Sequence, residues 1–229
     1  MSILDTLREK SWEPDTAQAT AAAMAAPPAR LDTQKLTLNI FLAVISVTFL
    51  LFMVTFISHT QYAGFQPLAG EPWKPLADTA QLWFNTALLA LSSASLHGAL
   101  ISARRGNVTV MAVALMGAAF LAAHFVLAQL WLWREMSGLG YTFTGNPANS
   151  YFYLLTAAHG IHLLGGLVVL ARAMVLLWRG ATSERIIPVL TLTTRYWHYL
   201  FGLWAVLFAL LASPPEVYDT IAAMCGLDG

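Results

Sequence analysis

The chain has 229 residues, of which 58% are hydrophobic and only 10% are charged. Soluble domains usually carry about a quarter charged residues, so water is not the main solvent of this protein. The 12 basic residues balance the 12 acidic ones, and this lack of a basic excess argues against nucleic acid as a partner. The only cysteine, Cys225, excludes an internal disulfide and any metal site built from several thiolates.

Residues 1–35 mix charged residues with an Ala/Pro stretch and contain no apolar run long enough for a signal peptide, so we expect a flexible, uncleaved cytoplasmic tail. Five apolar runs follow, at 36–58, 80–101, 108–132, 151–178 and 190–212. Each has the ~20 residues that a helix needs to cross the membrane, and only helices satisfy their own backbone hydrogen bonds there.

The sequence therefore predicts an all-α integral membrane bundle of five transmembrane helices over residues 36–212, followed by a short tail over 213–229. Ten of the 12 basic residues fall on one side of this arrangement, and only Lys74 and Arg134 fall on the other. The positive-inside rule then places the N-terminus in the cytoplasm and the C-terminus in the periplasm of a bacterial inner membrane. Trp178, Tyr196 and Trp197 are expected at the inner interface.

Small residues crowd the second to fourth runs, for example at 92–95, 117–119 and 165–166, and predict closely packed helices. The five runs contain no Asp, Glu or Lys, so we expect no proton transfer through acidic side chains of this chain. They do contain five of the six histidines. At 1.5 Å per residue, two of these lie toward the cytoplasmic end and three in the outer half: His97 and His198, and His124, His159 and His162.

Two interpretations of these histidines stay open on residue chemistry alone. In the first, imidazoles from two helices hold each of two b-type haems, with His97 opposite His198 and His124 opposite His159 or His162. The chain would then be a stand-alone membrane cytochrome. In the second, the histidines form hydrogen bonds between helices or to lipid headgroups.

Four stretches resemble subunit III of the haem–copper oxidases, in the family's own order. Residues 159–166 read HGIHLLGG and are similar to its "HGxH…G" helix, and residues 85–93 read NTALLALSS and are similar to its "NT-LLL-SS" helix. Residues 105–107 (RGN) resemble its "GN" turn, and residues 196–199 (YWHY) resemble its "YWHF" entry to the last helix. The resemblance covers about residues 36–212.

The resemblance implies that this chain supplies the last five helices of a seven-helix parent fold. It implies a non-catalytic subunit of a respiratory terminal oxidase, which reduces O2 to water with electrons from cytochrome c or quinol and pumps protons. Such a subunit carries no haem, copper or other metal, packs beside the catalytic subunit I in a complex with subunit II, and binds structural phospholipids. An accessory protein of a nitric oxide reductase, which shares the fold, is the alternative within the family.

The same resemblance implies structural or lipid-binding roles, with no catalytic residue, for seven positions. These are His159, His162, Trp197 and His198 in the bundle, and Arg104, Arg105 and Arg195 near the inner-leaflet headgroups. For the arginines, the positive-inside topology is an equally good explanation.

The sequence departs from the family pattern at two carboxylates. The family has an acid after a serine in the first shared helix, where this chain has Ser46-Val47. The glutamate of its "Q–E" pair is missing after Gln129, where the chain reads QLWL. These departures leave the lipid-binding and scaffolding role intact and put proton handling by this subunit in doubt.

Overall fold

The computed structural model describes residues 29–62, 65, 68 and 80–226; most of the predicted N-terminal tail and of the first long loop lie outside these residues. The described part is helical and contains no strand. Its helices are α3 (Ala29–Thr60), α4 (Ala80–Arg104), α5 (Val108–Gly138), α6 (Pro147–Trp178), α7 (Ser183–Leu211) and α8 (Pro215–Cys225). The all-α class is confirmed.

The predicted runs correspond to α3 to α7, with one notable shift in a boundary. Four helices, α3 to α6, are long and apolar enough to cross a membrane. α7 meets the same criterion only together with α8, to which it is joined through a bend of 108°. The chain therefore has four or five candidate spans. α7 begins at Ser183 rather than at residue 190, and Pro188 lies inside the helix, beyond its first turn.

The chain divides into two compact units, residues 1–37 and residues 38–229. The structure describes the first unit only from residue 29, where the start of α3 carries an ion pair between Lys35 and Asp32 (3.1 Å). The second unit contains the rest of α3 and all the other helices.

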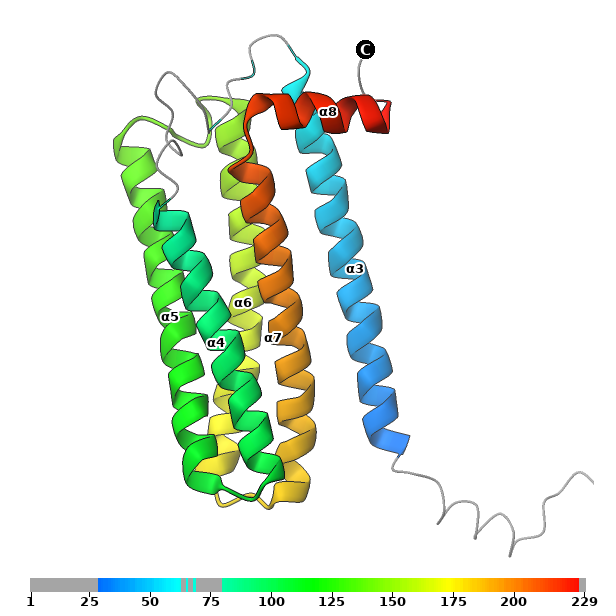
Figure 1. Ribbon diagram of the computed structural model, residues 1–229, viewed down its shortest axis with the longest axis vertical. Coiled ribbons are helices and arrows are strands. Elements are labelled where there is room, and N and C mark those ends of the chain that lie inside the picture. The colour runs from blue at the N-terminus through cyan, green and yellow to red at the C-terminus, as the bar shows by residue number, and fades with distance from the viewer. Residues whose placement is uncertain (1–28, 63–64, 66–67, 69–79, 227–229) are drawn as a thin grey trace, which may run out of the picture. The chain divides into compact units, whose positions relative to one another are not determined.

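Helices α4 to α7 form an antiparallel bundle in which α4 and α6 each lie beside both α5 and α7 (Figure 1). The α4–α5 and α6–α7 connections are short and lie at one end, the short-turn end. Gly106 adopts a positive φ of 72° in the first of these turns, and the Asn107 side chain then accepts a hydrogen bond from the N–H of Val110 to begin α5. The predicted turn over 105–107 is confirmed.

Serines and glycines bring the backbones of this bundle together, as the small residues predicted. Ser92 and Ser95 of α4 donate hydrogen bonds to the carbonyl oxygens of Ala118 and Ala114 of α5, both at 2.8 Å. Between α6 and α7, Gly166 lies so close to Trp197 that an added Cβ would be 2.8 Å from the indole Cζ3. The indole therefore packs directly on the α6 backbone.

From Leu38 onward, α3 contacts its neighbours mainly through large aromatic side chains. The Phe49 ring lies edge-on to His162 of α6, with a centroid distance of 5.7 Å. Ser46 shares a 2.9 Å hydrogen bond with the Tyr199 hydroxyl of α7, and Phe56 meets Tyr218 of α8 at 5.5 Å. Aromatic side chains therefore separate α3 from its neighbours, whereas small residues let the helices of the bundle lie closer together.

Helix α8 was not part of the sequence prediction, which placed only a short tail over residues 213–229. It follows the bend after α7 and ends at Gly226, which adopts a positive φ of 67°. Its Tyr218 is buried and donates a 2.7 Å hydrogen bond to the Leu210 carbonyl of α7. The bend is therefore fixed by a buried contact between the two helices.

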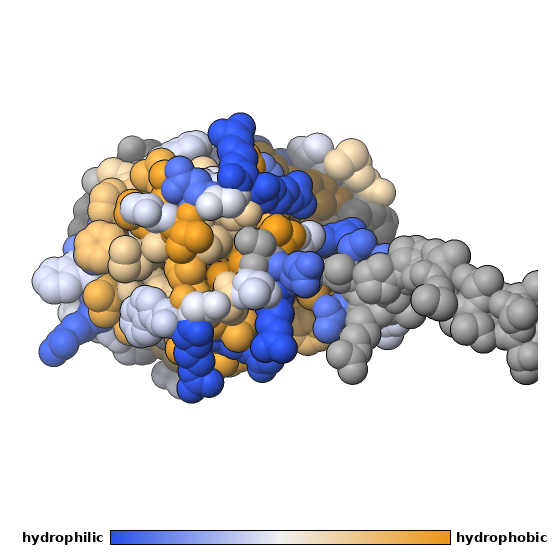
Figure 2. Space-filling view, turned by 90° about the horizontal axis from the view of Figure 1, so that it is seen from below, coloured by the Kyte–Doolittle hydropathy of each residue, from blue (hydrophilic) through white to orange (hydrophobic). Residues whose placement is uncertain are grey.

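Figure 2 views the molecule from the short-turn end, where hydrophilic side chains border an apolar centre. A cavity of ≈ 190 Å³ lies at this end, lined by residues of both turns that include Gly106, Met111, Gly180 and Ile186. Arg104, Arg105, Arg179 and Arg185 are exposed in the same turns and helix ends.

Candidate functional site

Buried polar side chains form the interior site of the bundle, and several of them bond one helix to another. The Asn85 amide on α4 donates to the Gln129 side-chain oxygen on α5 at 3.0 Å, and both residues are buried. The Trp204 indole N–H on α7 donates to Thr86 at 3.0 Å. All four helices of the bundle take part, since the Trp133 indole of α5 donates to a threonine of α6 at 3.1 Å.

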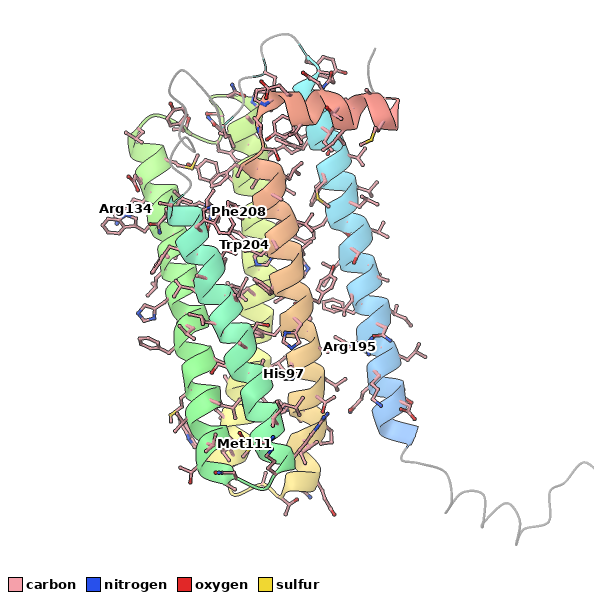
Figure 3. The ribbon with its side chains drawn as sticks, viewed as in Figure 1. His97, Met111, Arg134, Arg195, Trp204 and Phe208 are labelled. Atoms are coloured by element: carbon pink, nitrogen blue, oxygen red, sulfur yellow. The ribbon has the colours of Figure 1, made fainter. Side chains whose placement is uncertain are left out.

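His159 lies fully buried in this interior site, beside Trp204, which Figure 3 labels. Its ring packs against Trp204 at 5.3 Å and edge-on to Phe125 at 6.1 Å. Within the described residues, neither of its ring nitrogens has a hydrogen-bond partner, and neither has the Gln129 amide nitrogen. Two aromatic rings therefore enclose an imidazole whose hydrogen-bonding capacity is unused within the chain.

Trp197 is completely buried, contrary to the expectation that it lies at the inner interface. Its indole N–H donates to Ser92 of α4 at 3.0 Å, and its ring covers Gly166 of α6. The interface prediction was wrong because α7 begins at Ser183, which moves Trp197 from the mouth of the helix to its middle. Tyr196 is also largely buried, with an exposure of 9%, and it too lies close to Gly166.

His162, one turn along α6 from His159, belongs to the contact with α3 instead of the interior. It is half-buried, and its Nδ1 lies 2.7 Å from the Ala158 carbonyl oxygen in its own helix. Its carbonyl oxygen accepts a 2.9 Å hydrogen bond from the Tyr196 hydroxyl. Within the HGIH stretch, the His159 imidazole therefore points into the bundle and the His162 imidazole points toward α3.

His97 and His198 meet, as their predicted depth suggested, on the outer side of the bundle. His198 Nε2 lies 3.3 Å from His97 Nδ1, and His198 Nδ1 lies 2.6 Å from the Ser93 hydroxyl. Both nitrogens of His198 are therefore engaged by groups of α4. Both imidazoles are exposed on the surface of this chain.

The geometry does not bring together the second pair of the two-haem interpretation. His124 is exposed on α5, and its Nδ1 lies 2.9 Å from the carbonyl oxygen of Phe120 in the same helix. His159 points into the interior, where Phe125 and Trp204 surround it. In the described part of the chain, no three His, Cys, Asp or Glu side chains gather where they would hold a metal ion.

The three candidate arginines are exposed but lie at different heights. Arg104 and Arg105 end α4 and begin the following turn, so they lie at the short-turn end. Arg195 lies 12 residues into α7, about 18 Å along the helix from Ser183 at 1.5 Å per residue. Figure 3 shows Arg195 and His97 well away from the turns.

Sequence reasoning missed the interior residues that bond the helices together, namely Asn85, Gln129, Trp204 and Thr156. The available signals were the asparagine and threonine in the NTALLALSS stretch and a glutamine in the middle of an otherwise apolar run. A buried amide in a membrane helix is expected to find a partner on another helix, and this rule pairs Asn85 with Gln129.

These contacts define the class of protein: a multi-pass helical membrane protein whose buried polar side chains bond one helix to the next. The family model of cytochrome c oxidase subunit III matches residues 9–212. The chain therefore belongs to the cytochrome c oxidase subunit III family, the subunit of haem–copper terminal oxidases that carries no redox centre itself.

Known proteins similar to this chain have names that agree with the family. The probable cytochrome c oxidase subunit 3 of Mycobacterium tuberculosis is 24% identical over 153 residues, 66% of this chain and 75% of the relative. The cytochrome c oxidase subunit 3 of Thermostichus vulcanus is 27% identical over 164 residues, 66% of this chain and 76% of the relative. The cytochrome bo(3) ubiquinol oxidase subunit 3 of Pseudomonas aeruginosa is 26% identical over 144 residues, 62% and 68% of the two chains.

Proposed function

We propose that this chain is the non-catalytic subunit III of a respiratory oxidase that reduces O2 to water and pumps protons. The match to the subunit III family over residues 9–212 is the observation that carries the proposal. The interior geometry supports it, because the buried polar side chains bond helix to helix. We propose subunits I and II of such an oxidase as its protein partners.

The placement in the membrane is part of the proposal. The concentration of basic residues at the short-turn end supports a cytoplasmic N-terminus, a periplasmic C-terminus and a bacterial inner membrane. In this orientation the face that Figure 2 shows, an apolar centre bordered by hydrophilic side chains, is directed at the cytoplasm.

Stabilisation of the catalytic subunit and binding of structural phospholipids complete the proposed role. Arg104, Arg105 and Arg195 are exposed cations suited to lipid phosphates, and His162 and Trp197 maintain the packing on either side of α6. Replacement of Arg195 by Gln should reduce the phospholipid retained by the purified complex, measured by mass spectrometry. Arg134→Gln at the opposite end is the control, and equal retention in both variants would remove the specific role of Arg195.

Affinity purification through this chain in mild detergent tests the function. We expect a catalytic subunit that contains haem and copper to copurify, with a reduced-minus-oxidised spectrum that disappears when the chain is isolated from it. A copper-free catalytic partner would instead assign the chain to a nitric oxide reductase. A b-type band from the isolated chain would support the stand-alone cytochrome.

His159→Leu tests the structural role within the assembled complex. If His159 acts through packing, the variant should shorten the turnover lifetime or lower assembly while the initial rate of O2 consumption per complex stays unchanged. Immediate loss of activity in a fully assembled complex would contradict this role.

A further inference from the structure

Helix α8 lies beyond the part of the chain that the subunit III family accounts for. The family match ends at residue 212, and α8 begins at Pro215. The helix is joined to α7, the last of the proposed spans, through a bend of 108°. It therefore runs nearly at right angles to the span, at the end of the bundle opposite the short turns (Figure 1). A helix in this position lies close to the plane of the membrane surface.

The sequence of α8 is amphipathic. Val217, Ile221 and Met224 lie at positions i, i+4 and i+7 and share one side of the helix, which we call the apolar flank. Val217 is 38% exposed and Met224 is 76% exposed. At about 100° per residue, Glu216 and Asp219 fall on the other side, which we call the acidic flank. Amphipathic helices of this kind bind at the interface between lipid and water.

Tyr218 projects between the two flanks and fixes the helix to the rest of the chain. Its ring meets Phe56 of α3 edge-on at 5.5 Å, and its hydroxyl donates to the Leu210 carbonyl oxygen of α7 at 2.7 Å. The side of α8 that carries Tyr218 therefore faces other helices of this chain. Because α8 lies close to the membrane plane, one flank must face the hydrocarbon and the other must face water.

A contact with the end of α3 decides which flank faces water. The side-chain amide of Gln61 donates to Asp219 Oδ1 at 3.4 Å. Gln61 follows the last residue of α3 and lies five residues beyond Phe56, about 7.5 Å farther out along the helix. Since α3 runs away from the short-turn end, the acidic flank is directed out of the membrane (Figure 1). The apolar flank is then directed at the hydrocarbon.

We infer that α8 is an interfacial helix whose apolar flank binds the lipid surface at the end of the bundle opposite the short turns. In the proposed orientation this is the periplasmic leaflet. The helix contains no Lys or Arg, so apolar contact rather than attraction to anionic headgroups binds it. Through Tyr218, the bound helix also holds the outer end of α3. The inference goes beyond the proposed function, because it concerns a segment outside the family match and does not depend on the protein partner.

Fluorescence quenching tests which flank is in lipid. The full-length chain, with its native thiol removed as Cys225→Ser, carries a bimane label at Met224→Cys or at Ala223→Cys, its exposed neighbour on the acidic flank. It is placed in phosphatidylcholine nanodiscs with bromine on the acyl chains near the headgroups. The label at 224 should lose about half of its fluorescence to brominated lipid and resist aqueous iodide. The label at 223 should behave in the opposite way.

Two results would overturn the inference. Quenching of both labels by iodide would mean that the apolar flank faces water. A label at 224 that neither quencher reaches would mean that protein, and not lipid, covers this flank.

Hydrogen exchange gives an independent measure in the same nanodiscs. Met224→Glu should accelerate amide exchange in α8 about tenfold, roughly the effect of withdrawing two methylene groups from lipid. Ala223→Glu is the matched control and should leave the exchange of α8 unchanged. Equal exchange in the two variants would show that lipid does not bind the apolar flank.

Discussion

The α4–α7 bundle and helix α3 use opposite means of packing in the same membrane. In the bundle, Ser92, Ser95 and Gly166 allow the backbones to lie close together, so little space remains between the helices. Helix α3 is held instead by rings, of which Phe49 and Phe56 are almost completely buried. Larger side chains should therefore destabilise the bundle, and smaller side chains should destabilise the contact between α3 and the bundle.

The largest effect is expected for Gly166→Leu. The new side chain must occupy the place of the Trp197 ring, whose Cζ3 lies 2.8 Å from an added Cβ, so the helices must separate. Overpacking of this kind costs about 3 kcal/mol. Thermal unfolding in detergent, followed by circular dichroism, should show a lower midpoint. Gly165→Leu is the control, and an equal loss in both variants would show that α6 is sensitive to volume in general rather than at this contact.

Phe49→Ala should have the next largest effect, and the effect should be confined to α3. We expect a loss of about 2 kcal/mol, below the ~3–5 kcal/mol of aqueous cores because lipid tails replace part of the lost contact. Hydrogen exchange should accelerate in α3 and remain slow in α4 to α7. The exposed Leu50→Ala is the control. Faster exchange throughout the bundle would mean that α3 and the bundle form one cooperative unit.

Trp197→Phe tests one of the indole hydrogen bonds inside the bundle, the bond from Trp197 to Ser92. The variant keeps an aromatic ring over Gly166 but loses the 3.0 Å bond to Ser92. A loss of about 1.5 kcal/mol is expected on chemical unfolding. Trp178→Phe, at a position that is 75% exposed, should be neutral. Equal stability of the Trp197 variant and the wild-type chain would mean that the indole acts through volume alone.

The smallest effect is expected for Tyr199→Phe, which removes the 2.9 Å hydrogen bond between α7 and Ser46 of α3. Such bonds contribute about 0.6 kcal/mol on average in membrane proteins. A double-mutant cycle with Ser46→Ala isolates the contribution, since Ser46→Ala should cost less when the Tyr199 hydroxyl is already absent. Fully additive losses would show that the two hydroxyls do not act as a pair.

The sequence predicted those features that depend on periodic or cumulative signals. Runs of about 20 apolar residues sufficed to locate α3 to α6. The similar depths predicted for His97 and His198 correctly placed these two residues close together. Each of these depends on local composition or on rise along a helix.

What the sequence did not predict depends on rotation about a helix axis and on where a helix begins. Trp197 was placed at an interface because the start of the last span was set at residue 190, whereas residues 183–189 are helical as well. The separation of His159 from His124 follows from the direction in which each side chain points, which spacing along one helix does not reveal. Helix α8 was missed because 11 residues are too short for an apolar-run criterion.

The two serine bonds between α4 and α5 also limit how these helices can move. Ser92 and Ser95 lie one turn apart and donate to carbonyl oxygens that are likewise one turn apart. Sliding α4 along α5 by about half a turn, roughly 2.7 Å, breaks both bonds at once. The two helices therefore resist sliding along each other, although the pair can still tilt as a unit.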